Sequence, residues 1–139
     1  MYTPTIIPTS TRIPTATRLI ATPTRVKSRR EEEVEDFIVY YWGLISAKEF
    51  SVAYRYLTES FKSEFKIESL SKYADGFKYT DHVDVISVKI TRLANTEAVV
   101  EALVGFYSVY GDVIEYNHRY YLVKEDGIWK FNMSEKIRK

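Results

Sequence analysis

The chain contains no cysteine, which excludes disulfide bonds, thiolate metal ligands and a cysteine nucleophile. It also lacks any run of the roughly 18–20 consecutive apolar residues that a membrane helix needs. No apolar stretch follows Met1 as it would in a secretory signal peptide. We therefore expect no membrane insertion within this chain, and expect any targeting element of an exported protein to lie outside it.

Acidic residues are absent from the first thirty positions, which carry six Lys or Arg side chains. The whole chain has a net charge of +1, so residues 31–139 carry a charge of −5. A mildly acidic folded part argues against a nucleic-acid-binding surface. We expect no nucleic-acid partner.

Proline is absent after residue 23, and each of the four prolines is followed by threonine. Proline fixes φ and removes a backbone donor, which opposes a long helix or a central strand. We interpret residues 1–27 as a basic, Pro/Thr-rich disordered linker or stalk and residues 28–139 as one domain. The same composition leaves two alternatives open, an organellar transit peptide and a basic arm for acidic partners.

Helical signals occupy the first half of the domain. Ser28-x-x-Glu31 is a capping box, in which each side chain accepts a hydrogen bond from the other residue's backbone N–H. Apolar residues then recur at helical spacing up to Ile45. Ser46-x-x-Glu49 matches a second capping box and predicts a new helix there. Thr58 is a candidate cap for a third helix, and a last helical turn or two ends near Gly76.

Strand signals follow Tyr79. Residues 82–92, 97–110, 114–124 and 128–133 are rich in Val, Ile, Tyr and Phe, and turn residues separate them. Asp126-Gly127 favours a type I′ hairpin turn, and Gly105 within the second strand favours a bulge or a bend that curves the sheet. We expect an α+β fold in which N-terminal helices pack on a curved four-stranded antiparallel sheet.

Two segments resemble the nuclear transport factor 2-like superfamily, which includes ketosteroid isomerase-like and polyketide cyclase-like proteins. Residues 125–131 (EDGIWKF) are similar to the last strands of small bacterial members, and residues 50–61 (FSVAYRYLTESF) are similar to their second helix. The resemblance covers residues 31 to about 134 and implies a cone-shaped α+β fold. A Pro/Thr-rich stalk on such a domain looks like bacterial cell-surface proteins.

The resemblance also implies a pocket between the helices and the concave face of the sheet. The side chains expected to reach it are Tyr41, Tyr54, His118 and Tyr120. They are candidate binding residues for a small apolar ligand, although tyrosines in such positions are more often structural. His82 and Asp84 share one strand face, but two side chains do not make a metal or acid–base site.

Isomerase chemistry of this superfamily needs a carboxylate base, and no Asp or Glu is convincingly placed for that role. We therefore assign no catalytic residue, no metal site and no cofactor. The favoured hypothesis is a non-enzymatic ligand-binding or assembly module of a surface or exported protein, dimerising through the outer sheet face. The alternatives are a small isomerase- or cyclase-type enzyme acting on an apolar ring substrate, and a cytoplasmic or organellar location.

Overall fold

The computed structural model describes residues 27–137, so the predictions for residues 1–26 lie outside it. Four helices come first, α1 (Arg29–Ser46), α2 (Phe50–Tyr54), α3 (Glu59–Glu64) and α4 (Leu70–Asp75). Four strands follow, β1 (Thr80–Leu93), β2 (Glu97–Ser108), β3 (Val113–Glu125) and β4 (Ile128–Lys136), in one antiparallel sheet of order β1-β2-β3-β4. The expected α+β class is confirmed. None of the helices described is long and apolar enough to cross a membrane.

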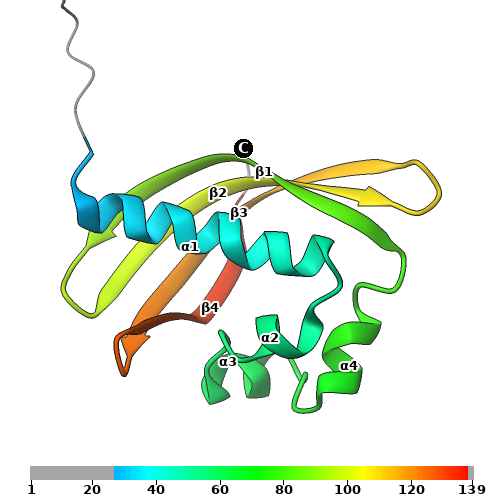
Figure 1. Ribbon diagram of the computed structural model, residues 1–139, viewed down its shortest axis with the longest axis horizontal. Coiled ribbons are helices and arrows are strands. Elements are labelled where there is room, and N and C mark those ends of the chain that lie inside the picture. The colour runs from blue at the N-terminus through cyan, green and yellow to red at the C-terminus, as the bar shows by residue number, and fades with distance from the viewer. Residues whose placement is uncertain (1–26, 138–139) are drawn as a thin grey trace, which may run out of the picture.

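The sheet curves over the helices, which all lie on its concave side (Figure 1). Helix α1 runs along this concave face, and α2, α3 and α4 gather near its C-terminal end. The hairpin formed by β2 and β3 extends past the end of α1. The molecule therefore has a covered inner face and an outer face on which no described element packs.

The start of α1 follows the capping rules read from the sequence. The Ser28 hydroxyl accepts from the Glu31 N–H at 3.2 Å, and the Glu31 carboxylate accepts from the Ser28 N–H at 2.9 Å. The apolar stripe of the helix is buried against the sheet; its buried members are Val34, Phe37, Ile38, Tyr41, Trp42 and Ile45. The capping box and the stripe together fix where this helix begins and which side it buries.

The second predicted capping box, at Ser46, is wrong, although the new helix expected within a few residues does begin at Phe50. Helix α1 continues through Ser46 and ends in a turn in which Lys48 has φ 65° and the Glu49 N–H donates to the Leu44 carbonyl. Helix α2 begins after Glu49, whose side chain makes no capping hydrogen bond. The Ser46 hydroxyl instead accepts from the Val83 N–H at 2.8 Å and donates to the Val83 carbonyl at 3.1 Å. The Ser46 hydroxyl therefore bonds to strand β1 instead of capping helix α2.

The strand predictions were right in number and order, with one error of detail. Asp126 and Gly127 both have positive φ, 52° and 78°, as a type I′ turn between β3 and β4 requires. Gly105, however, pairs without interruption with Asp84 on β1 and Glu115 on β3. The register shifts between β1 and β2 lie on β1. They fall at Asp81, Ile86 and Thr91, which have no pairing partner on β2. These bulges bend an edge strand, which also discourages further strand pairing there.

Candidate functional site

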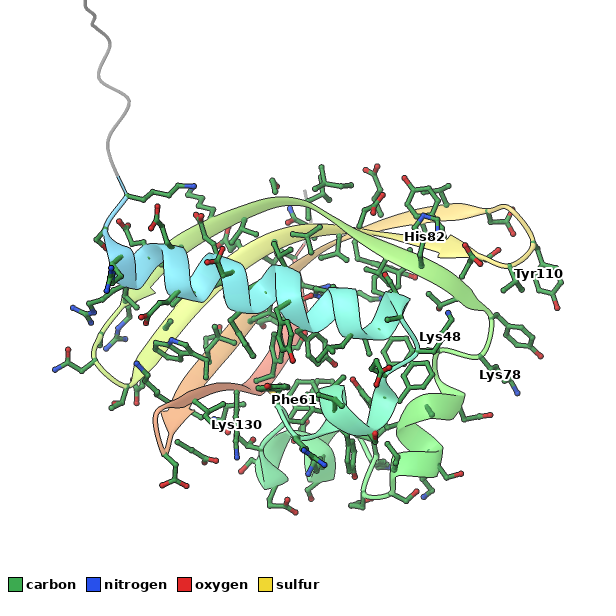
Figure 2. The ribbon with its side chains drawn as sticks, in the orientation of Figure 1. Lys48, Phe61, Lys78, His82, Tyr110 and Lys130 are labelled. Atoms are coloured by element: carbon green, nitrogen blue, oxygen red, sulfur yellow. The ribbon has the colours of Figure 1, made fainter. Side chains whose placement is uncertain are left out.

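A pocket of about 280 Å³ lies between the short helices and the concave face of the sheet. Phe61, on α3, points into this region from below the sheet (Figure 2). The walls are mostly aromatic, and the full lining comprises Tyr41, Trp42, Phe61, Phe65, Ile67, Lys72, Tyr73, Gly76, Phe77, His118, Tyr120, Phe131 and Ser134. The pocket is thus apolar, with a few polar groups, as small-molecule sites usually are.

Two buried tyrosines from different helices meet at one wall. The hydroxyls of Tyr41 on α1 and Tyr73 on α4 lie 2.5 Å apart, and either can donate to the other. Burial raises the pKa of Tyr41 well above its ordinary value and also raises the pKa of Tyr73. Both hydroxyls therefore stay protonated at neutral pH and act as hydrogen-bond partners rather than as bases.

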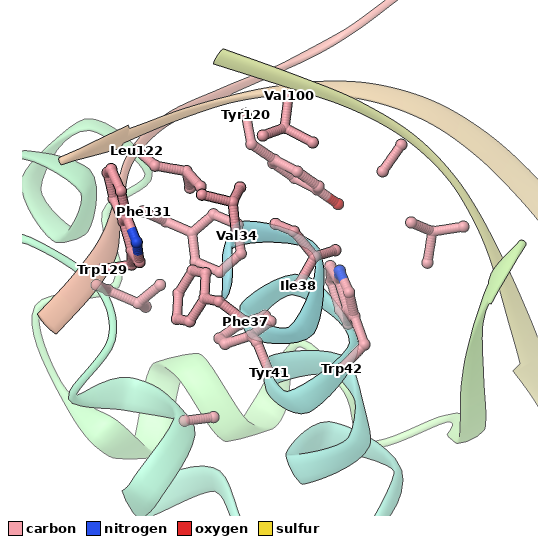
Figure 3. Close-up of a cluster of buried hydrophobic side chains, with 14 of the residues drawn as sticks. Val34, Phe37, Ile38, Tyr41, Trp42, Val100, Tyr120, Leu122, Trp129 and Phe131 are labelled. Atoms are coloured by element: carbon pink, nitrogen blue, oxygen red, sulfur yellow. The ribbon is translucent and has the colours of Figure 1, made fainter. Parts of the chain in front are cut away.

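Strand β3 supplies the opposite wall. The Tyr120 hydroxyl lies 3.1 Å from His118 Nδ1, and burial raises the pKa of Tyr120. Burial, and secondarily the Lys136 ammonium, lowers the pKa of His118, so its imidazole is neutral at neutral pH. In Figure 3 Tyr120 reaches from the sheet toward Trp42, whose buried indole N–H makes no hydrogen bond of regular geometry among the described residues.

Tyr54 is placed differently from the other three predicted binding residues. Tyr41, His118 and Tyr120 line the pocket, whereas Tyr54 does not. Its ring packs against Tyr73 with centroids 5.2 Å apart, and its hydroxyl donates to the Ile67 carbonyl at 2.6 Å. The Lys62 ammonium lies 4.2 Å from the centre of the same ring. Tyr54 therefore supports the wall that Tyr73 forms and has its own polar group satisfied.

The lining contains no Asp or Glu, so the pocket offers no carboxylate base. Two carboxylates on the nearby helices are paired with lysines: Glu59 pairs with Lys62, and Asp75 pairs with Lys78. Proton abstraction next to a carbonyl would fall to the His118 imidazole alone, which already contacts Tyr120. The arrangement suits binding of a compact apolar molecule.

The polar cluster at the start of β1 is a surface feature. His82 Nδ1 lies 2.8 Å from an Asp81 carboxylate oxygen, and the His82 ring stacks on Tyr107 with centroids 4.2 Å apart. The His82 and Asp81 side chains are 43% and 63% exposed. Across residues 27–137 no group of three or more His, Asp or Glu side chains is arranged to hold a metal ion.

Ten of the thirteen lining residues were not among the predicted binding residues, and Trp42 and Lys72 are two of these ten. Trp42 adjoins the predicted stripe of α1, so an aromatic ring beside Tyr41 was the available signal. Lys72 is an exposed residue of a six-residue helix, and its sequence neighbours do not reveal that this helix closes one side of a pocket. Both residues line the pocket because of contacts between elements that are far apart in the chain.

No family model and no curated protein matches the sequence. Several solved structures do resemble the fold. The association domain of C. elegans CaMKII is 16% identical with a TM-score of 0.58, and the match covers 76% of this chain and 93% of that one. A putative calcium/calmodulin-dependent protein kinase II association domain from Xanthomonas campestris is 14% identical with a TM-score of 0.61, over 84% and 91%.

The CaMKII hub homology domain of Chlamydomonas reinhardtii is 17% identical with a TM-score of 0.57, covering 76% of this chain and 96% of that one. At these identities the likeness concerns the fold alone. The superposition covers 91–96% of the length of these domains, so the fold is shared over nearly all of each. The chain therefore has the nuclear transport factor 2-like fold.

Proposed function

We propose that residues 28–139 form a self-assembly module that pairs with a second copy of this chain through the outer face of the sheet. The observation that carries the proposal is the composition of that face. All the described helices lie on the opposite side (Figure 1), yet the outer face carries apolar side chains at its centre. Antiparallel sheets with one solvated face normally alternate apolar and polar residues.

The outer face is organised in rows across the strands. Val99 on β2, Tyr121 on β3 and Met133 on β4 are register partners and form an apolar row. Leu103 lies further along β2 on the same face, because side chains two positions apart point the same way. All four are partly exposed. Pairing with a second copy would remove this apolar surface from water, which favours association.

A row of charges lies between Val99 and Leu103 on the same face. The Arg119 guanidinium donates to Glu135 at 3.1 Å and to Glu101 at 3.2 Å, and the Tyr121 hydroxyl donates to Glu135 at 2.6 Å. These contacts lower the pKa of Glu135, with the Tyr121 hydroxyl as the first cause and Arg119 as the second. The row therefore stays ionised and internally paired.

Lys89 on β1 is the register partner of Glu101, so two cations and two carboxylates share this row. A row without net charge does not repel its own copy, and charges that already have partners cost less to cover. The similar solved structures include domains titled as association domains and as a hub homology domain. Their likeness supports assembly as the role of this fold here.

The test is sedimentation velocity of the full chain over a wide concentration range, with Leu103→Glu as the disrupting variant. Leu103→Glu places a buried, unpaired carboxylate in the contact, so the dimer is expected to dissociate to monomer. Val39→Glu is the matched control, because Val39 is 54% exposed on α1, which lies on the concave side of the sheet and not on its outer face. A wild-type chain that stays monomeric, or a dimer unaffected by Leu103→Glu, would contradict the proposal.

We also propose, from the Pro/Thr-rich composition of residues 1–27 alone, a cell-surface or exported location. Fusing these residues to a fluorescent reporter and fractionating the cells tests this against the alternative of a targeting peptide. Import of the reporter into an organelle would overturn the surface assignment.

A further inference from the structure

The pocket changes character between its interior and one rim. Its interior walls come from aromatic rings, among them Phe61, Phe77 and Phe131. Its volume of 280 Å³ is slightly below the range of roughly 300–1,000 Å³ that is typical of small-molecule sites. A ligand that fits it must be compact, with an apolar body about the size of one ring.

The charge at the pocket is of one sign. Lys72 is the one lysine in the lining, and no Asp or Glu accompanies it. Lys72 is exposed on α4, and it enters none of the ion pairs between described residues. On the other side, the Lys136 ammonium is close enough to His118 to lower the pKa of that imidazole. A cationic rim stands out because residues 31–139, which include the whole pocket, have a net charge of −5.

The hydroxyl groups of the interior are already paired, and the donor beside them that is unpaired among the described residues, the buried Trp42 indole N–H, carries no charge. The hydroxyls of Tyr41 and Tyr73 bond to each other, and the Tyr120 hydroxyl contacts His118. A charged head group placed beside them would lose its hydration without gaining a cation, which is costly. A charged group on the ligand is therefore held at the rim, where Lys72 remains partly hydrated.

We propose that this pocket binds a small carboxylate with an apolar, ring-sized body. The body lies among Phe61, Phe65 and Phe77, and the carboxylate lies at the rim beside Lys72. A carboxylate accepts a charge-assisted hydrogen bond from an ammonium, and an aromatic body gains edge-to-face contacts with the ring walls. This inference concerns a site on the inner face, separate from the assembly proposed for the outer face.

The experiment compares three probes that share one body and differ in head group, which are phenylpropionate, phenylpropanol and phenylpropylamine. Each is titrated calorimetrically into the full-length protein. We expect phenylpropionate to bind most tightly and the amine least. Lys72→Gln should weaken phenylpropionate about two- to fivefold, the range of a partly exposed ion pair, and leave phenylpropanol unchanged.

Lys130→Gln is the charge-matched control, because Lys130 pairs with Glu125 and does not line the pocket. Phe65→Ser should weaken all three probes in parallel, since Phe65 lines the apolar part and is exposed enough for the variant to fold. No measurable binding, equal binding of acid and alcohol, or a Lys72→Gln variant that binds phenylpropionate like wild type would overturn the proposal. Sedimentation of the same samples reports assembly independently.

Discussion

The two ends of the concave sheet face are closed in different ways. At one end the stripe of α1 lies directly on the sheet, and Val34, Ile38, Val100 and Leu122 are at most 1% exposed (Figure 3). At the other end three helices of five or six residues take over, and their aromatic side chains leave a pocket.

The difference shows what helix length provides. An 18-residue helix can present a continuous apolar stripe to the sheet. Helices shorter than about 12 residues are marginal by themselves and depend on packing and caps, here the Thr58 and Ser69 hydroxyls. We therefore assign stability mainly to the α1 end and binding to the end with short helices.

The largest expected effect tests the α1 end. Ile38→Ala removes a fully buried side chain and should cost about 2–5 kcal/mol of unfolding free energy, because the site cannot collapse around the cavity. Val39→Ala, one position along and 54% exposed, should change it by no more than about 0.5 kcal/mol. Urea unfolding of the three proteins measures both. Equal losses in the two variants would show that α1 is not the stabilising layer.

The α1 end was also the easier part to predict. A capping box and a 3.6-residue repeat lie within one segment, so the sequence contains the whole signal. Ser46 shows the limit of such local patterns: its spacing to Glu49 is that of a cap, but strand β1 offers its hydroxyl a donor and an acceptor on Val83. A bulge at Gly105 was not found for a similar reason, because the register shifts between β1 and β2 lie on β1.

A smaller effect is expected from the hydroxyl pair at the pocket wall. Tyr41→Phe leaves the buried Tyr73 hydroxyl without its partner, which should cost about 1–3 kcal/mol of unfolding free energy. The double variant Tyr41→Phe/Tyr73→Phe should cost less than the sum of the two single variants, because no orphaned hydroxyl remains. Tyr110→Phe is the control, with Tyr110 75% exposed at the tip of the β2–β3 hairpin (Figure 2). Additive single variants would contradict the pairing.

The pocket end shows why binding residues were harder to predict than the fold. Alternation along β3 correctly placed His118 and Tyr120 on the inner face. The contacts of Tyr73 and Lys72 depend on how α4 packs against α1 and α2, and no period within α4 encodes that. The resemblance implied that Tyr54 reaches the pocket, but its ring lies against Tyr73, which lines the pocket in its place.

The smallest expected effect is a pH dependence of the unfolding free energy that arises from His118 at the pocket end. Burial, then Lys136, lowers the pKa of His118 in the folded protein, so the unfolded chain binds the proton more readily. Stability then rises with pH through the window between the folded pKa and the unfolded value of about 6.5, and is lost as pH falls through that window. Protonation would also fix the direction of the Tyr120 contact, since a protonated Nδ1 can only donate to the Tyr120 hydroxyl.

Urea unfolding of wild type and His118→Asn from neutral to mildly acidic pH measures this contribution as the difference between the two curves. Wild type should lose more stability than the variant as the pH falls below about 6.5. His82→Asn is the control, because His82 is 43% exposed beside Asp81, and it should keep the wild-type loss. Parallel curves for wild type and His118→Asn would mean that the imidazole is hydrated, and that water reaches the wall of the pocket where we place an apolar ligand.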